Sequence, residues 1–189
     1  MTKDTKSNLA TVIGFPHGDH STAAKVADSM VCLEKGCDEL DMVINIGKLK
    51  SGDLDFVYED MKFVCDVIHE QGKICKVILE TCYLTDEEVV TACKLAANAG
   101  LDFVKTSTGF GNAGAKVHHL KIMSANIPDS MQVKASGGIR NLDQLLSAVA
   151  AGATRIGASA IKEIVEEAEL REKDGPISIE IKEDMGEGY

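Results

Sequence analysis

The chain has 189 residues, of which 44% are hydrophobic and 4% aromatic, and this content suits one compact domain with a mainly aliphatic core. A formal net charge of -10 at pH 7, without a basic run, argues against binding to nucleic acid or to an anionic membrane surface. No apolar run reaches the length of a membrane span, so we expect small molecules or other proteins as partners.

Short apolar runs alternate with longer amphipathic stretches from residue 10 to about residue 170, and Gly or Asp usually marks the return from helix to strand. This alternation predicts a series of six βα units. The expected strands are 10–15, 39–45, 74–80, 103–107, 132–135 and 154–157. The helices expected after them are 21–35, 55–71, 86–99, 116–124, 142–151 and 160–171.

Capping residues support these limits. Ser21, Thr85 and Asn141 are suitable N-caps, and Glu88 stands at the capping-box position relative to Thr85. Glycines stand where C-terminal caps belong, at Gly36, Gly72, Gly100 and Gly152. Repeated βα units imply parallel strands joined by right-handed crossovers. Polar groups inside successive strands, with glycine-rich loops after the last ones, favour a barrel over an open doubly wound sheet.

We expect residues 1–171 to form a single, partial barrel domain and residues 172–189 to form a flexible acidic tail. The alternating piece 177–181 is the one part of this tail that could add a short strand.

The six cysteines are spread over predicted helices and strands, and they form no C-x-x-C pair. We therefore expect reduced, structural thiols rather than disulfides or a zinc site. The polar start of the chain, residues 1–8, has no signal-peptide pattern. A cytoplasmic location follows from both observations.

Three lysines, Lys76, Lys105 and Lys134, recur at one spacing, each within an apolar run typical of a buried strand. Burial of an ammonium group costs free energy unless the group is paired, neutralised or used in catalysis. Lys105 lies where its strand turns polar before a glycine, which is the end of the strand where barrel enzymes place catalytic groups. Its amine could form a Schiff base with a carbonyl, and pairing with a buried carboxylate is the structural alternative.

Lys134 occupies the same relative place one unit later. Adjacent strands would bring the two amines close together, and repulsion between two ammonium groups lowers the pKa of one of them. Lys76 stands earlier in its strand, so we favour a structural role, with Glu80 as its partner on the same face. Asp41 is expected to point inward, either to hold a proton-shuttling water or to serve as a fixed counter-charge for the amines.

Glycine-rich turns follow the last three predicted strands, and their backbone N–H groups can surround a phosphate. These turns are 108–109, 136–140 and 157–159, and Arg140 either neutralises charge nearby or caps the next helix. The five histidines lack metal-ligand spacing, so we expect no metal site and little support for metal-assisted enolate chemistry.

Five runs, in this order, resemble deoxyribose-phosphate aldolase: ATVIGFP (10–16), ELDMV (39–43), KVILET (76–81), DFVKTSTGF (102–110) and KASGGIR (134–140). The resemblance covers about residues 9 to 165. It implies a fold of the (β/α)8 TIM-barrel family and a class I aldolase that uses neither a metal nor a cofactor. The implied reaction is the reversible cleavage of 2-deoxy-D-ribose 5-phosphate to D-glyceraldehyde 3-phosphate and acetaldehyde.

The resemblance also assigns roles to individual residues. It makes Lys105 the Schiff-base lysine, Lys134 the lysine that lowers its pKa, and Asp41 the acid of the proton relay. It places the substrate phosphate against five residues of the loops, Gly109, Gly137, Gly138, Gly157 and Ser159. Some family members carry a C-terminal tail that ends in tyrosine and folds over the site, and the resemblance extends this role to Tyr189.

The resemblance begins at what looks like the family's third strand, so we expect an incomplete barrel of about six βα units that lacks the first two. Such a sheet has two edges with unpaired backbone groups, which a homo-oligomer would be one way to cover. Two other functions stay open on the sequence. One is a phosphosugar-binding homologue without catalysis that completes its sheet with another chain. The other is a phosphosugar isomerase, for which Glu80 is the candidate base.

Overall fold

The computed structural model describes residues 7–185. One sheet contains six strands in the order of the chain: β1 Ala10–Ile13, β2 Glu39–Val43, β3 Ile74–Ile78, β4 Phe103–Lys105, β5 Gln132–Ser136 and β6 Arg155–Gly157. The helices are α1 Thr22–Glu34, α2 Ile46–Lys50, α3 Leu54–Glu70, α4 Asp86–Ala99, α5 Val117–Ala125, α6 Leu142–Ala150 and α7 Ile161–Glu172. A single 3₁₀ turn, η1, covers Thr81–Tyr83.

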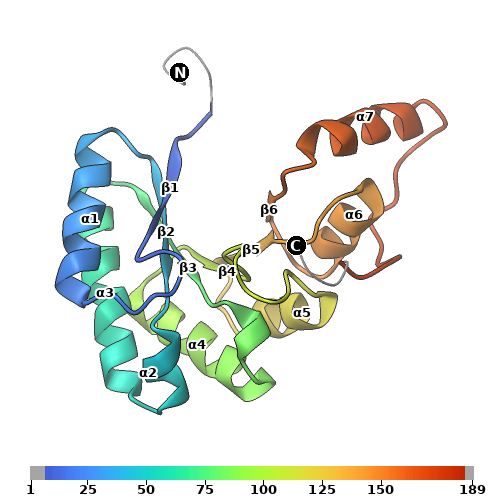
Figure 1. Ribbon diagram of the computed structural model, residues 1–189. Coiled ribbons are helices and arrows are strands. Elements are labelled where there is room, and N and C mark those ends of the chain that lie inside the picture. The colour runs from blue at the N-terminus through green and yellow to red at the C-terminus, as the bar shows by residue number, and fades with distance from the viewer. Residues whose placement is uncertain (1–6, 186–189) are drawn as a thin grey trace.

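Each strand pairs in parallel with the next strand of the chain. The sheet curves, with β1 and β6 at its two ends and the helices on its outer side (Figure 1). Within the part of the chain that the structure describes, β1 and β6 do not pair with each other, so the sheet is an open half-barrel. The predicted incomplete barrel of six βα units is confirmed.

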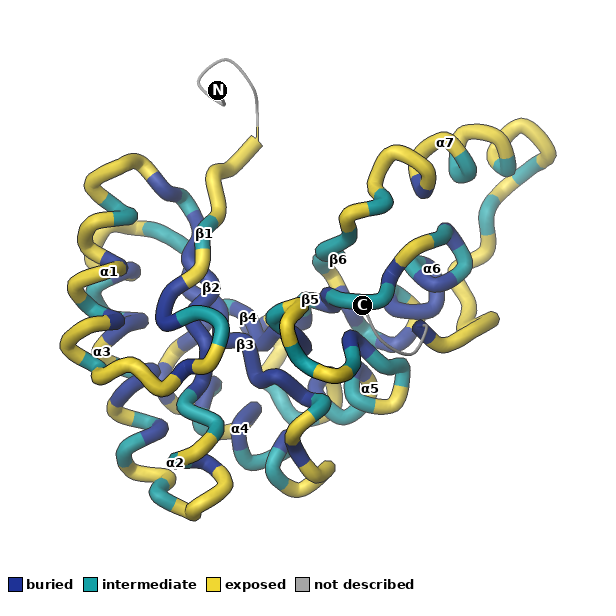
Figure 2. Tube along the Cα trace, viewed as in Figure 1, coloured by how far each residue is buried: buried dark blue, intermediate teal, exposed yellow. Residues whose placement is uncertain are grey.

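The two faces of the sheet have different chemistry, because side chains alternate along each strand. Residues that face the helices are apolar and fully buried, as shown by Leu40, Met42, Val77 and Val104. Figure 2 shows this buried layer running along the strands and the helix faces that cover them. The inner face instead carries charged and polar side chains. The hydrophobic core therefore lies between the sheet and its helices, and the charged side chains lie on the concave side.

The first four strands each end two residues earlier than the sequence pattern indicates. In β2 and β3 a polar residue at the expected strand end takes up a different conformation. Asn45, expected in a strand, is the N-cap of α2, and its side chain accepts a hydrogen bond from the backbone N–H of Lys48. Glu80, expected at the end of β3, has the left-handed backbone conformation and precedes η1. The short elements α2 and η1 were not predicted, since neither is long enough to show helical periodicity.

The predicted helix caps are confirmed. Ser21 and Asn141 accept hydrogen bonds from backbone N–H groups of α1 and α6, and Thr85 forms a capping box with Glu88. Gly100 ends α4 with a φ of 86°, a conformation that a residue without a Cβ adopts at little cost. Local sequence therefore fixes where these helices begin and end.

The described part of the C-terminal tail contains no strand, although it makes specific contacts. The backbone N–H groups of Lys182 and Glu183 donate to Ser147 Oγ on α6, at 3.1 and 3.2 Å. The carboxylate of Asp184 accepts a hydrogen bond from Val117 N–H at the start of α5. Residues 182–184 thus lie against the last helices, and the flexibility of the tail stays a prediction. Tyr189 lies outside the described residues.

A buried ion pair joins the helical layer to the sheet. Lys25 of α1 and Asp60 of α3 have side chains that are 0% and 1% exposed, and their Nζ and Oδ2 atoms are 2.5 Å apart. Lys25 also donates to the carbonyl of Val43 at the end of β2, and Thr22 Oγ1 donates to the other oxygen of Asp60. Besides their mutual contact, this cation and this carboxylate each have a further hydrogen bond to a protein group.

We expect Lys25→Met to lower the free energy of unfolding by about 3–5 kcal/mol, because it leaves the carboxylate of Asp60 buried without its cation. Urea denaturation measures this change. The matched control is Lys62→Met. It removes an exposed pair with Asp66 on α3, the helix that carries Asp60, and should leave stability almost unchanged. A loss below about 1 kcal/mol for Lys25→Met would contradict the assignment of this pair as a structural anchor.

Candidate active site

Strand register brings the lysines of the inner face together. Lys105 on β4 and Lys134 on β5 are paired positions of neighbouring strands, and Asp41 on β2 is paired with Lys76 on β3. Paired positions on adjacent strands lie about 4.8 Å apart and point to the same side. Lys105 and Lys134 are therefore side by side, whereas Lys76, at the same spacing in the sequence, is paired with Phe103 and lies two positions before the partner of Lys105.

Asp41 is the centre of this cluster. Its Oδ2 atom lies 2.7 Å from Lys134 Nζ and 3.0 Å from Lys105 Nζ. Its Oδ1 atom lies 2.6 Å from Lys76 Nζ. One carboxylate thus contacts all three of the lysines that the sequence singled out. The amines of Lys105 and Lys134 share one oxygen atom, so they are close neighbours.

The charged network continues beyond Asp41 to Glu39 on β2 and Arg155 on β6. Lys76 Nζ is also 2.7 Å from Glu39 Oε2, and the same oxygen accepts a hydrogen bond from the guanidinium of Arg155 on β6. Asn8 donates to the other oxygen of Glu39 at 3.0 Å. Positive and negative groups therefore alternate from Arg155 through Glu39, Lys76 and Asp41 to the two remaining lysines.

Burial and neighbouring charges shift the pKa values of the site in opposite directions. Burial alone would raise the pKa of Asp41, but the ammonium groups of Lys105, Lys134 and Lys76 outweigh it and hold that pKa well below its usual range. Burial lowers the pKa of Lys105, the positive charge of Lys134 lowers it further, and Asp41 opposes both. Asp41 is accordingly a carboxylate in the resting site, and Lys105 loses its proton more easily than an ordinary lysine.

Glu39 shows the same balance. Burial would raise its pKa, yet hydrogen bonds from Asn8, Lys76 and Arg155 bring it down to about 2.

Glu39 and Arg155 were not among the residues nominated from the sequence. The signal for Glu39 was available, because it precedes Asp41 by two residues on a strand and so shares its face. Arg155 had no such signal, since its contact with Glu39 joins β6 to β2 across the concave side of the sheet.

The predicted pairing of Lys76 with Glu80 is wrong. Lys76 is bonded to Glu39 and Asp41, whereas the Glu80 carboxylate accepts hydrogen bonds from Thr108. The expectation rested on the two-residue period of a strand that was thought to reach position 80. Strand β3 ends at Ile78, and Glu80 has a φ of 54°, so the alternation does not extend to it.

The five residues proposed for phosphate binding follow three neighbouring strands, β4, β5 and β6. Gly109, Gly137 and Gly138 have positive φ angles of 97°, 84° and 79°, which favour glycine. The loops after β4 and β5 are packed against each other, because a Cβ on Gly114 would lie 2.3 Å from the carbonyl of Gly137. Gly157 ends β6, and Ser159 is exposed just beyond it. Their role toward phosphate stays a prediction.

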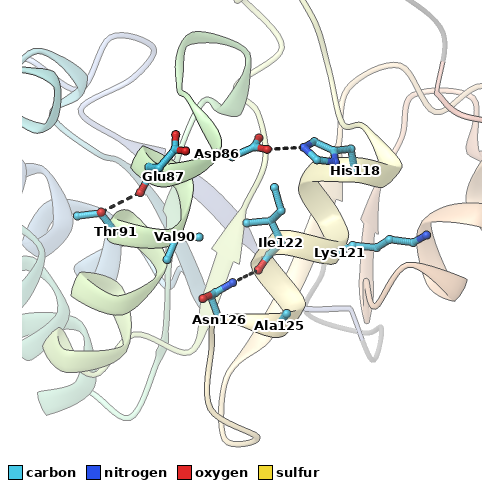
Figure 3. Close-up of a pocket in the computed structure, with 9 residues that line it drawn as sticks. All are labelled: Asp86, Glu87, Val90, Thr91, His118, Lys121, Ile122, Ala125 and Asn126. Atoms are coloured by element: carbon cyan, nitrogen blue, oxygen red, sulfur yellow. Dashed lines mark hydrogen bonds and ion pairs between the residues drawn. The ribbon is translucent and has the colours of Figure 1, made fainter.

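An open cavity of about 360 Å³ reaches this cluster on the concave side, where it is lined by Glu39, Lys134 and Arg155 together with residues of β1 and β6. A wider depression of about 640 Å³ lies elsewhere, between α4 and α5 (Figure 3). There His118 Nε2 is 2.8 Å from Asp86 Oδ2, and the other lining side chains belong to the same two helices or to the residue that ends α5. This depression contains none of the strand residues, so we place the candidate active site at the amine cluster.

Comparison with known proteins identifies the family of the chain. Residues 1–167 match the model of the DeoC/LacD family aldolases. A deoxyribose-phosphate aldolase of Aciduliprofundum boonei is 51% identical over 168 residues, which are 89% of this chain and 76% of that protein. A deoxyribose-phosphate aldolase of Thermococcus gammatolerans is 53% identical over 164 residues, which are 87% of this chain and 73% of that protein. A deoxyribose-phosphate aldolase structure from Aeropyrum pernix, described as tetrameric, has a TM-score of 0.79 and 33% identity, covering 86% of this chain and 68% of that one. This chain, whose charged strand positions line one concave face, belongs to the DeoC/LacD family of aldolases.

Proposed function

We propose that this protein is a class I aldolase that reversibly cleaves 2-deoxy-D-ribose 5-phosphate to D-glyceraldehyde 3-phosphate and acetaldehyde. The observation that carries the proposal is the buried amine of Lys105 next to a second amine, Lys134, on one shared carboxylate. Two relatives of about 50% identity carry the name of this enzyme. No metal is needed in this mechanism, because an iminium ion on the lysine supplies the electron sink.

The first step is addition of the neutral Lys105 amine to C1 of the open-chain sugar. The amine nitrogen forms a bond to C1, the carbonyl oxygen takes up a proton, and loss of water from the carbinolamine leaves an iminium ion. Burial and the nearby charge of Lys134 favour the neutral amine that this step requires. Lys134, which stays close to the same oxygen of Asp41, is placed to donate the proton that the departing hydroxyl needs.

The second step breaks the bond between C2 and C3, since the products contain two and three carbon atoms. A base removes the proton of the C3 hydroxyl, the electrons of the C2–C3 bond move to the iminium, and an enamine and D-glyceraldehyde 3-phosphate result. Protonation of the enamine at C2 and addition of water release acetaldehyde. Asp41 begins this cycle ionised, so we assign it first as a base and counter-charge, and as an acid only after it has taken up a proton.

The alternatives are weaker. A binding protein without catalysis has no need for a second amine beside a buried lysine, and the similar proteins are named as aldolases. An isomerase would use Glu80 as its base, but this carboxylate is already bonded to Thr108.

We also propose that the protein works in the cytoplasm as a homo-oligomer. None of the described helices could cross a bilayer, and the Aeropyrum pernix relative is described as a tetramer.

Treatment with acetaldehyde and sodium borohydride should fix an ethyl group on Lys105, because hydride reduces the iminium ion to a stable amine. Peptide mass mapping locates the modified residue. In Lys105→Met the adduct and the aldol cleavage should both be lost, whereas Lys73→Met, which removes an amine paired with Asp38, should behave as the wild type. An adduct on another lysine, or cleavage that persists in Lys105→Met, would refute the proposed function.

Replacement Asp41→Asn should lower kcat for cleavage of 2-deoxy-D-ribose 5-phosphate by about 10²–10⁴-fold, the range expected for loss of a proton-transfer group. Steady-state kinetics with a coupled assay for D-glyceraldehyde 3-phosphate measures this effect. Asp38→Asn, just before the same strand, is the control and should keep near wild-type kcat. A loss below about tenfold in Asp41→Asn would remove Asp41 from the proton relay.

The rate of adduct formation should rise with pH, because the neutral form of Lys105 is the nucleophile and becomes more abundant above its pKa. Lys134→Met removes a cation that lowers this pKa, so the profile should move to higher pH. Asp41→Asn removes the group that raises the pKa, so the profile should move to lower pH. Borohydride trapping at a series of pH values measures both shifts, and equal profiles in all three proteins would contradict the proposed tuning of Lys105.

A further inference from the structure

Glu80 has an unusual backbone conformation next to the candidate active site. Among the described residues it is the only one other than glycine with a positive φ, with φ at 54° and ψ at 59°. Side chains with a Cβ avoid this region, and residues held there concentrate at functional sites. Glu80 is also 2% exposed, so its carboxylate has been removed from water. A strained backbone and a buried charge at one residue call for a compensating interaction.

The compensating interaction is with the loop that follows Lys105. The backbone N–H of Thr108 donates to both oxygens of Glu80, at 3.2 and 3.3 Å, and the Thr108 hydroxyl donates to Oε2. Thr108 Oγ1 in turn accepts a hydrogen bond from Phe110 N–H at 3.0 Å. One carboxylate therefore orders the turn from Thr108 to Phe110, which begins three residues after the amine that is proposed to attack the substrate.

Close packing between the same two loops supports this contact. The backbone N–H of Thr81 donates to the carbonyl of Thr106 at 3.0 Å. A Cβ on Gly111 would stand 2.7 Å from Cys82 Sγ and 3.2 Å from the Glu80 carboxylate. The loop after β3 is thus hydrogen-bonded to the loop after β4 and packed against it. The loop after β4 in turn packs against the glycine-rich turn after β5. The position of Thr108 and Gly109 relative to Lys105 depends on Glu80.

We propose that Glu80 is a positioning residue for the phosphate-bearing end of the substrate. Its carboxylate holds the Thr108–Gly109 turn in the orientation that receives this end while C1 lies at Lys105. The inference rests on the proposed function and adds a residue that acts through Thr108 rather than on the reacting atoms. It predicts that loss of the carboxylate weakens binding of the phosphosugar but leaves the reaction of Lys105 with acetaldehyde, which has no phosphate, unchanged.

The test compares Glu80→Gly, Glu80→Gln and Thr108→Val with the wild type. Glycine suits the left-handed backbone, so Glu80→Gly removes the carboxylate without adding strain. We expect kcat/KM for 2-deoxy-D-ribose 5-phosphate to fall by about tenfold or more, mainly through a higher KM. Glu80→Gln keeps an oxygen that can accept from Thr108 N–H and should stay within about threefold of the wild type. Borohydride trapping of acetaldehyde on Lys105 should stay within about twofold in every variant.

A double variant, Glu80→Gly with Thr108→Val, should lose little more than either single change, because the two residues act as one unit. Glu87→Ala, an exposed carboxylate on α4, is the control and should match the wild type. Unchanged kcat/KM in Glu80→Gly, or an equal loss of trapping and cleavage, would overturn the positioning role. Absence of the acetaldehyde adduct in the wild type would instead overturn the proposed function, so the two failures are distinguishable.

Discussion

The structure depends on one carboxylate that neutralises several buried amines. Without Asp41 the cations of Lys76, Lys105 and Lys134 would face one another across three neighbouring strands with little water to separate them. Burial of one unpaired ammonium already costs several kcal/mol. Asp41 pairs with all three amines. The cluster still carries a net positive charge, because the cations outnumber the carboxylates that contact them. Burial lowers the pKa of Lys105, the charges of Lys134 and Lys76 add to this effect, and Asp41 opposes it.

The two faces of the sheet allow the charged cluster and the hydrophobic core to form on opposite sides of the same strands. Apolar side chains on the outer face pack against the helices and form the hydrophobic core. Pairs such as Lys25 and Asp60 then fix individual helices relative to the strand that carries Asp41, since Lys25 also contacts the carbonyl of Val43. Rigid strands thereby hold the amines within hydrogen-bonding distance of one carboxylate, and the loops beyond the strand ends are left to bind the substrate.

The loops are connected to one another as well as to the strands. Glu80 links the loop after β3 to the loop after β4, and Gly114 links that loop to the turn at Gly137. A substrate that spans from Lys105 to the glycine-rich turns would therefore meet one continuous surface. The proposed positioning role would account for the left-handed conformation of Glu80, since residues held in such conformations concentrate at functional sites. Under the proposed function, the amine cluster on the strands would carry the chemistry and the loops beyond the strand ends would place the substrate.

The sequence by itself determined the βα order, the helix caps and the three lysines, because these features follow from local patterns of burial, hydrogen bonding and side-chain alternation. It also indicated that Lys105 and Lys134 would be neighbours, since both stand near the ends of consecutive strands. The spacing alone was not sufficient, because Lys76 has the same spacing and is paired with Phe103. Only the tertiary structure decided that Asp41 contacts both of these amines at once, and which carboxylates Lys76 and Arg155 meet. Lys76 is paired with Glu39 and Asp41 rather than with Glu80, and Arg155 reaches Glu39 from a distant strand. The curvature of the sheet and the early end of β3 set these partners, and neither leaves a local signal in the chain.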